Sequence, residues 1–110
     1  MADAHDALAA DAEGFAVADP TRPLHTNADG SVVASGAEYR RLLVDQVNRP
    51  VRWDRCMEAF AAAGATGLIE AAPAGTLTGL AKRALKGIAL VNLNSPADLD
   101  AAAELLAQAQ

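Results

Sequence analysis

The sequence predicts an α/β fold in which parallel strands are joined by helical crossovers, and three observations support this prediction. From Trp53 onward, the patterns follow the order helix, strand, helix, strand, helix. The two strand patterns, residues 66–70 and 88–91, are short apolar runs between turn residues, as expected for buried strands. The pattern between these runs is helical, and a helical crossover between neighbouring strands favours parallel pairing.

Five helices are predicted from apolar residues that repeat at helical spacing between capping and stopping residues. They cover residues 2–12, 35–47, 53–63, 76–85 and 95–107. Ser35 lies three residues before Glu38, which is the spacing of a capping box. Ser95 is a predicted N-cap, and Pro96 follows it in the first turn. The starts of these two helices therefore depend on specific residues as well as on periodicity.

The region between the first two helices is predicted to contain short strands. Residues 15–18 are apolar and precede an Asp-Pro turn signal. Residues 23–26 and 31–33 flank the turn sequence Asn-Ala-Asp-Gly and are predicted to form a small hairpin. His25 lies in this hairpin and His5 on the first helix, and neither has a companion ligand at metal spacing. We expect His5 to be a solvated residue and predict no metal site.

The composition indicates one domain with a thin core. Hydrophobic residues make up 52% of the 110 residues, but aromatic residues only 4%, so small aliphatic side chains must fill the interior. Since the free energy of unfolding is a small difference between large terms, each lost contact matters. The only cysteine, Cys56, is expected to be buried and inert. A single cysteine excludes an internal disulfide and a multi-cysteine metal site.

The sequence gives no sign of membrane insertion or export. No apolar run reaches the roughly 20 residues that a membrane-spanning helix needs. Asp3 and Asp6 stand where a signal peptide would carry basic residues. We therefore expect a cytoplasmic chain without a membrane partner.

Charge is unevenly distributed along the chain, although the net charge is −5. Residues 40–86 contain eight basic and four acidic residues, whereas the flanks contain one basic and ten acidic residues. A basic centre suits a phosphate-bearing ligand or an acidic partner protein. Alternatively, the arginines at 40–41 form a solvated helix face, and the three cations within residues 82–86 offset a helix dipole. Aromatic residues do not interleave these charges, so no nucleic-acid partner is expected.

Two further features have both a functional and a structural interpretation. A glycine-containing turn within residues 73–80 opens a helix, and helix N-termini attract anions. This turn matches neither a P-loop nor a dinucleotide fingerprint, so a structural turn is the preferred interpretation. The serines are Ser31 in the hairpin and Ser35 and Ser95 at helix caps, and each position has a structural explanation.

Two motifs carry a resemblance to a known family. The first, Gln-x-x-x-Pro-Val-x-Trp, begins at Gln46 and ends at Trp53, and the second, Glu-x-x-Pro-x-x-x-Leu-Thr-Gly-Leu, begins at Glu70. With both motifs, the chain resembles the C-terminal part of the malonyl-CoA:acyl-carrier-protein transacylase family along nearly its whole length. The resemblance implies part of the α/β-hydrolase-like large subdomain of an acyltransferase, so that residues 1–110 form a single partial domain. It places the nucleophile elbow and the ferredoxin-like subdomain outside this chain.

The resemblance also implies an activity and one site residue. Family members transfer malonyl from coenzyme A to the phosphopantetheine of an acyl carrier protein through a serine ester, and they use no further cofactor. Gln46 matches the glutamine whose backbone carbonyl orients the catalytic histidine. Met1 matches the methionine of a His-Thr-x-x-Met motif, which places that histidine four residues upstream of Met1. The catalytic serine, in a Gly-His-Ser-x-Gly elbow, is also expected upstream.

The expected consequence is that this chain alone is inactive. The alternatives are a small non-catalytic α/β interaction module and a subunit that another chain completes. Removal of the strands from a larger sheet would leave unpaired backbone edges and bare apolar faces. We therefore expect the isolated chain to self-associate or to pack loosely.

Overall fold

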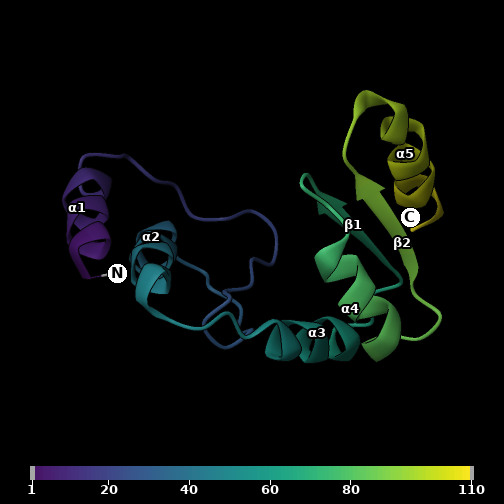
Figure 1. Cartoon of the computed structure of the whole chain (residues 1–110), viewed down its shortest axis with the longest axis horizontal. Helices are drawn as coiled ribbons and strands as arrows, with labels where there is room; N and C mark the ends of the chain where they lie inside the picture. Colours follow the sequence, from purple (N-terminus) through teal and green to yellow (C-terminus); the bar gives the residue numbers. More distant parts are fainter. Residues whose placement is uncertain (1, 110) are drawn as a thin grey trace. The chain divides into compact units, whose positions relative to one another are not determined.

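The computed structural model describes residues 2–109 and divides into two compact units, Met1–Ala59 and Phe60–Gln110, here called the N-terminal and C-terminal units (Figure 1). The elements are α1 (Ala2–Ala12), α2 (Gly36–Asp45), η1 (Gln46–Asn48), α3 (Trp53–Ala62), β1 (Gly67–Ala71), α4 (Thr76–Ala84), β2 (Ala89–Leu93), η2 (Pro96–Asp98) and α5 (Leu99–Gln108). All five predicted helices and both predicted strands are present, and their ends differ from the predicted ends by a few residues. The predicted burial of the strands is wrong, because Glu70 is the one buried residue in β1 and β2 has none. The single-domain organisation stays a prediction.

In the C-terminal unit, β1 and β2 form a parallel pair joined by α4. Their register runs from Gly67 opposite Ala89 to Ala71 opposite Leu93. The α/β prediction with parallel strands and a helical crossover is therefore confirmed. Among the described residues, these two strands make up the only sheet.

The two long helices of the C-terminal unit lie on opposite faces of this pair (Figure 1). The Glu70 carboxylate reaches the start of α4 on one face. A Cβ atom on Gly67 would lie 2.9 Å from Leu105 of α5. Successive side chains of a strand point to opposite faces, so positions 67 and 70 differ in face. The sheet is thus covered above and below, as its apolar strand sequences require.

In the N-terminal unit, the predicted strand at residues 15–18 does not form. The Arg40 guanidinium donates a hydrogen bond to the carbonyl of Phe15, and the Asp19 carboxylate accepts one from the backbone N–H of Gly36. This segment therefore bonds to α2 instead of to a neighbouring strand. The predicted hairpin forms, but only as one antiparallel bridge between His25 and Val32.

The core is thin in both units. The buried hydrophobic residues are Val33, Val44, Cys56, Ala81 and Ala102. Larger apolar side chains remain exposed, and Phe15 is 68% accessible. This distribution agrees with the prediction of a core built from small side chains. None of the described helices combines the length and apolar character needed to cross a bilayer.

Candidate functional site

Gln46 lies where α2 passes into η1, and both its backbone and its side chain shape the link that follows. The carbonyl oxygen of Gln46 accepts a hydrogen bond from the backbone N–H of Arg49 at 3.1 Å. The side-chain amide Nε2 donates to the carbonyls of Arg49 and Pro50 at 3.2 and 3.0 Å. The carbonyl is therefore bonded to one backbone N–H, and a carbonyl oxygen can accept two hydrogen bonds.

The link ends on the turn of residues 26–31. The N–H of Arg52 donates to the carbonyl of Asn27 at 2.8 Å, immediately before α3 begins. Gly30 in this turn has φ +79°, and a Cβ atom there would lie 2.6 Å from the backbone of Arg55. Only glycine fits such an approach in the left-handed region without a shift of the backbone. The turn and the start of α3 are therefore held tightly together.

Cys56 fills the space under this turn. Its side chain is 2% accessible, and its Sγ lies 3.6 Å from the Thr26 carbonyl and 3.7 Å from Asn27 Oδ1. Burial, followed by the charges of Asp29 and Asp54, raises the pKa of this thiol. A thiol with a raised pKa is a poor nucleophile. The predicted burial is confirmed, and the raised pKa accords with an inert role.

The second motif forms a turn that one carboxylate organises. Oε1 of Glu70 accepts hydrogen bonds from the backbone N–H groups of Gly75 at 3.0 Å and Thr78 at 2.9 Å. These bonds, with that from Gly75 first, lower the pKa of Glu70. Thr78 Oγ1 donates to Asn92 Oδ1 on β2 at 2.6 Å, and the Asn94 amide bonds to both backbone groups of Ala74.

This arrangement decides between the two interpretations of the turn. The backbone N–H groups that would attract an anion at the start of α4 already bind the carboxylate of Glu70. A phosphate would have to displace a charge-assisted pair of hydrogen bonds. The structural interpretation, preferred from the sequence, is the one that this geometry supports.

The three serines take structural positions. Ser31 Oγ donates to Asp29 Oδ1 at 2.6 Å, which lowers the pKa of that carboxyl. Ser35 Oγ accepts the N–H of Glu38 at 3.2 Å, and Ser95 forms a capping box with Asp98. Ser35 and Ser95 are thus the helix caps that the sequence predicted.

His5 corrects one expectation, because its side chain is partly buried and hydrogen-bonded instead of free in solvent. Its Nε2 lies 3.0 Å from Asp45 Oδ1 on α2, and its Nδ1 lies 3.2 Å from Asp6 Oδ1. Hydrogen bonds to Asp45 and then to Asp6 raise the pKa of His5. The sequence contained no local signal for this pair, since the two partners are 40 residues apart. No group of three or more metal-ligating side chains occurs in residues 2–109.

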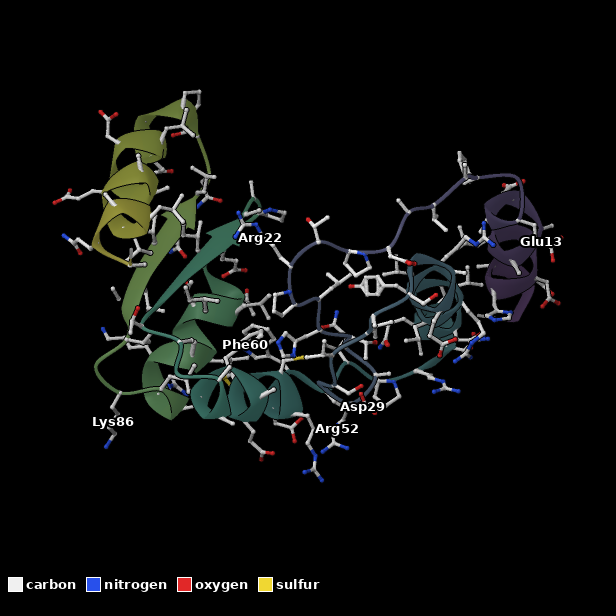
Figure 2. The ribbon with its side chains drawn as sticks, turned by 180° about the vertical axis from the view of Figure 1, so that it is seen from behind. Glu13, Arg22, Asp29, Arg52, Phe60 and Lys86 are labelled. Atoms are coloured by element: carbon white, nitrogen blue, oxygen red, sulfur yellow. The ribbon has the colours of Figure 1, made fainter. Side chains whose placement is uncertain are left out.

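The basic residues of the central region take several kinds of position, and Arg40 donates to the carbonyl of Phe15. Arg41 pairs with Glu38, and Arg52 pairs with Asp54. The hydrogen bond from Arg52 lowers the pKa of Asp54 to about 2. Lys82 and Arg83 lie in the last turn of α4, where cations offset the helix dipole. Lys86 follows the helix and points away from the ribbon (Figure 2). This placement fits the dipole interpretation and leaves the phosphate or acidic-partner alternative untested.

Comparison with known proteins gives a consistent result over nearly the whole chain. No family model matches. The chain is 47% identical over 96% of its length to a malonyl CoA-acyl carrier protein transacylase of Mycobacterium tuberculosis, and it covers 35% of that protein. It is 36% identical over 96% of its length to the Escherichia coli protein of the same name, and it covers 34% of it. The chain thus spans about one third of the length of these relatives.

Solved structures agree with the sequence comparison. The crystal structure of MCAT from Mycobacterium tuberculosis superposes with a TM-score of 0.87 at 47% identity, with 96% of this chain and 34% of that chain covered. A malonyl-transacylase in complex with a type II PKS acyl-carrier protein gives a TM-score of 0.79 at 34% identity. There, the coverage is 91% of this chain and 32% of the other.

Proposed function

Because the chain belongs to the malonyl-CoA:acyl-carrier-protein transacylase family, of whose members it spans about one third, we propose that it supplies the C-terminal part of such an acyltransferase. In the proposed reaction, a serine hydroxyl attacks the malonyl thioester of coenzyme A, and the coenzyme A thiol leaves. The phosphopantetheine thiol of an acyl carrier protein then attacks the serine ester and frees the hydroxyl. Each step forms one acyl bond and breaks one. No further cofactor is proposed.

The catalytic serine and histidine of the proposed reaction are proposed to lie outside this chain. Its sequence contains no Gly-His-Ser-x-Gly elbow, and its three serines serve a turn and two helix caps. The chain alone is therefore proposed to be inactive. Its β1–α4–β2 crossover supports a place in an α/β-hydrolase-like subdomain, since parallel strands with helical crossovers are the unit from which such sheets are built.

Gln46 is the residue proposed to act in catalysis, as a positioning residue. A histidine that donates Nδ1–H to its backbone carbonyl would be held in the tautomer whose Nε2 can accept the serine proton. The carbonyl is bonded to the N–H of Arg49 and can accept a second donor. The side-chain amide of Gln46 donates to the carbonyls of Arg49 and Pro50, and these bonds tie the link to the residue that carries the proposed acceptor.

The observation that carries the proposal is the 47% identity over 96% of the chain together with the TM-score of 0.87. We propose to test it with a chimera in which residues 1–110 replace the matched third of the Mycobacterium tuberculosis transacylase. Malonyl transfer to an acyl carrier protein should stay within about tenfold of the parent, since tenfold corresponds to only about 1.4 kcal/mol of barrier. A folded chimera without transfer would contradict the proposal. So would transfer by the isolated chain that is lost when one of its own serines is replaced.

The second candidate function is a non-catalytic α/β interaction module, or a subunit completed by another chain. The exposed apolar side chains of the N-terminal unit favour it, because they need a cover. This candidate predicts that the chain is stable, forms a complex in its native host, and confers no activity on the chimera.

A further inference from the structure

An ion pair joins α1 to the end of α2 in the N-terminal unit. His5 Nε2 lies 3.0 Å from Asp45 Oδ1, and the two side chains are 24% and 26% accessible. Asp45 is the last residue of α2 and directly precedes Gln46, and α1 contacts both α2 and η1. The carboxylate that His5 binds therefore belongs to the residue next to the one whose backbone carbonyl is proposed to act in catalysis.

The Asp45 carboxylate is held from two directions. Its Oδ2 accepts a hydrogen bond from Arg41 Nη1 at 2.9 Å, within α2, whereas its Oδ1 faces His5 on α1. Arg41 is in turn bound to both carboxylate oxygens of Glu38. Charge-assisted hydrogen bonds to both oxygens fix the orientation of a carboxylate. Of the two bonds to Asp45, only that from His5 places the end of α2 against another helix.

Both ring nitrogens of His5 face carboxylates. Nδ1 lies 3.2 Å from Asp6 Oδ1, and Nε2 lies 3.0 Å from Asp45 Oδ1. An ionised carboxylate only accepts hydrogen bonds, and a neutral imidazole has one N–H to donate. Both contacts can therefore be hydrogen bonds only when His5 is an imidazolium. Loss of its proton removes one of the two bonds and the positive charge.

Other charged side chains lie around this pair on both helices and on the link after η1. They are Asp6 on α1, Glu13 directly after α1, Arg40 and Arg41 on α2, and Arg49. The arginines disfavour a further positive charge, whereas the carboxylates favour it. The hydrogen bond to Asp45, followed by that to Asp6, raises the pKa of His5. The acidic neighbours therefore prevail, and the imidazolium is favoured.

We propose that His5 and Asp45 are positioning residues of the malonyl-transfer reaction, which hold the Gln46 carbonyl where it accepts the Nδ1–H of the catalytic histidine. The inference rests on the proposed function. In that proposal, the catalytic histidine lies four residues upstream of Met1, so α1 is the helix that follows it. The pair then ties the segment that carries the histidine to the carbonyl that orients it. Such alignment matters because a misplacement of about 1 Å can cost about 100-fold in rate.

The first test follows the backbone amide of Arg49, which donates to the Gln46 carbonyl, in the isolated chain and in the chimera. After correction for intrinsic rates, its hydrogen exchange should be about threefold slower at about pH 5.5 than at about pH 8.5, a small effect because the ion pair is partly exposed. His5→Gln and Asp45→Asn should each remove this difference.

Ala10→Gln, at an exposed position of α1 away from the pair, is the matched control and should keep the difference. Asp45→Asn leaves the His5 side chain in place, so it separates the contact from a direct effect of the His5 charge on the amide. A wild-type Arg49 amide without pH dependence would overturn the proposal. So would a response that survives in both His5→Gln and Asp45→Asn.

The second test measures malonyl transfer by the chimera. At about pH 6, His5→Gln and Asp45→Asn should each lower kcat about threefold and leave the KM for malonyl-CoA within about twofold, because they disturb the base and not the substrate site. The double variant should lose no more than either single variant, since both act through one bond. The loss should shrink at about pH 8.5, where the wild type has lost the ion pair as well.

An equal loss in Ala10→Gln, or losses that add in the double variant, would overturn the positioning role. A folded wild-type chimera that transfers no malonyl would contradict the proposed function and, with it, the role of the pair in catalysis. The Arg49 amide would then still show whether the pair holds the Gln46 carbonyl.

Discussion

The turn after β1 in the C-terminal unit and the packing of α2 in the N-terminal unit differ in how far along the chain their carboxylates reach. In the C-terminal unit, the Glu70 carboxylate bonds to N–H groups five and eight residues ahead of it. In the N-terminal unit, Asp19 bonds to Gly36, 17 residues away, and His5 lies against Asp45, 40 residues away. In the C-terminal unit, near neighbours in sequence thus bind the start of α4, and Asn92 and Asn94 add bonds to the same turn from 14 and 20 residues away. The N-terminal contacts of Asp19 and His5 join segments that meet only after the chain has folded back.

This comparison predicts that single changes harm the N-terminal unit most where two distant segments touch. Gly36→Ala should destabilise it by about 1–3 kcal/mol, the usual range for overpacking, because the new Cβ would lie 2.1 Å from the Ala18 carbonyl oxygen. Gly79→Ala is the matched change in the C-terminal unit, where nothing lies within 4 Å. Gly79→Ala should instead raise the free energy of unfolding by about 0.5–1 kcal/mol, since alanine is the better helix former.

Urea unfolding provides the measurement for both glycine variants. The fluorescence of Trp53, the only tryptophan, reports on the N-terminal unit, and circular dichroism reports on the helices of both. Equal stability of the Gly36→Ala variant and the wild type would show that residues 15–20 do not depend on α2.

The next largest effect is expected within the C-terminal unit. Glu70→Ala leaves the N–H groups of Gly75 and Thr78 without their acceptor, so hydrogen exchange at these amides should become about tenfold faster. Glu70→Gln, which keeps an acceptor but loses the charge, should lie in between. Glu104→Ala on exposed α5 is the control. Unchanged exchange at both amides in Glu70→Ala would refute the role of this carboxylate.

The same residue should make this turn sensitive to acid. The pKa of Glu70 is lowered on folding, so its stabilising effect is present above its unfolded value of about 4.5. That effect is lost as the pH falls through the folded value. Exchange at Gly75 and Thr78, corrected for its intrinsic pH dependence, should therefore rise in acid in the wild type and not in Glu70→Ala.

The smallest effect is expected for His5, because its partner Asp6 is exposed and its partner Asp45 is only partly buried. Its pKa is raised on folding by Asp45 and Asp6, so its contribution is fully present below the unfolded value of about 6.5. The contribution is lost as the pH rises through the folded value. Amide exchange in α1, corrected for intrinsic rates, should therefore be slower at pH 5.5 than at pH 8.5, and His5→Gln should remove the difference. A nuclear magnetic resonance titration that gives His5 an ordinary pKa would contradict this account.

The features that could be predicted from the sequence are those set by residues close together in the chain. Ser35 marks the start of α2 and Ser95 the start of η2, because a cap acts on N–H groups within three residues. The parallel pair could be predicted because apolar runs alternate with helical spacing. The segment after α1 could not, because residues 15–18 are apolar and extended, yet their bonding partner is Arg40 on α2. Periodicity describes a segment's own preference and not the partner it finds.

In the candidate site, the positions of the two motifs could be predicted from the sequence, and the partners of their side chains could not. The Gln46 link and the Glu70 turn were both located from motif spacing. The carboxylate that occupies the start of α4 was not foreseen, because the side-chain direction of Glu70 depends on the face of β1 that α4 covers. The Asp45 partner of His5 was missed because it lies on a different helix.

The composition of β1 and β2 has one more consequence. Strands that natural proteins leave at the border of a sheet usually carry lysine or proline, which discourage another chain from pairing there. Neither strand contains either residue, and the one charge, on Glu70, is turned toward α4. These are sequences suited to interior strands. We therefore expect this chain to aggregate less in cold, dilute solution, because each edge of the two-stranded sheet can pair with a strand of another molecule.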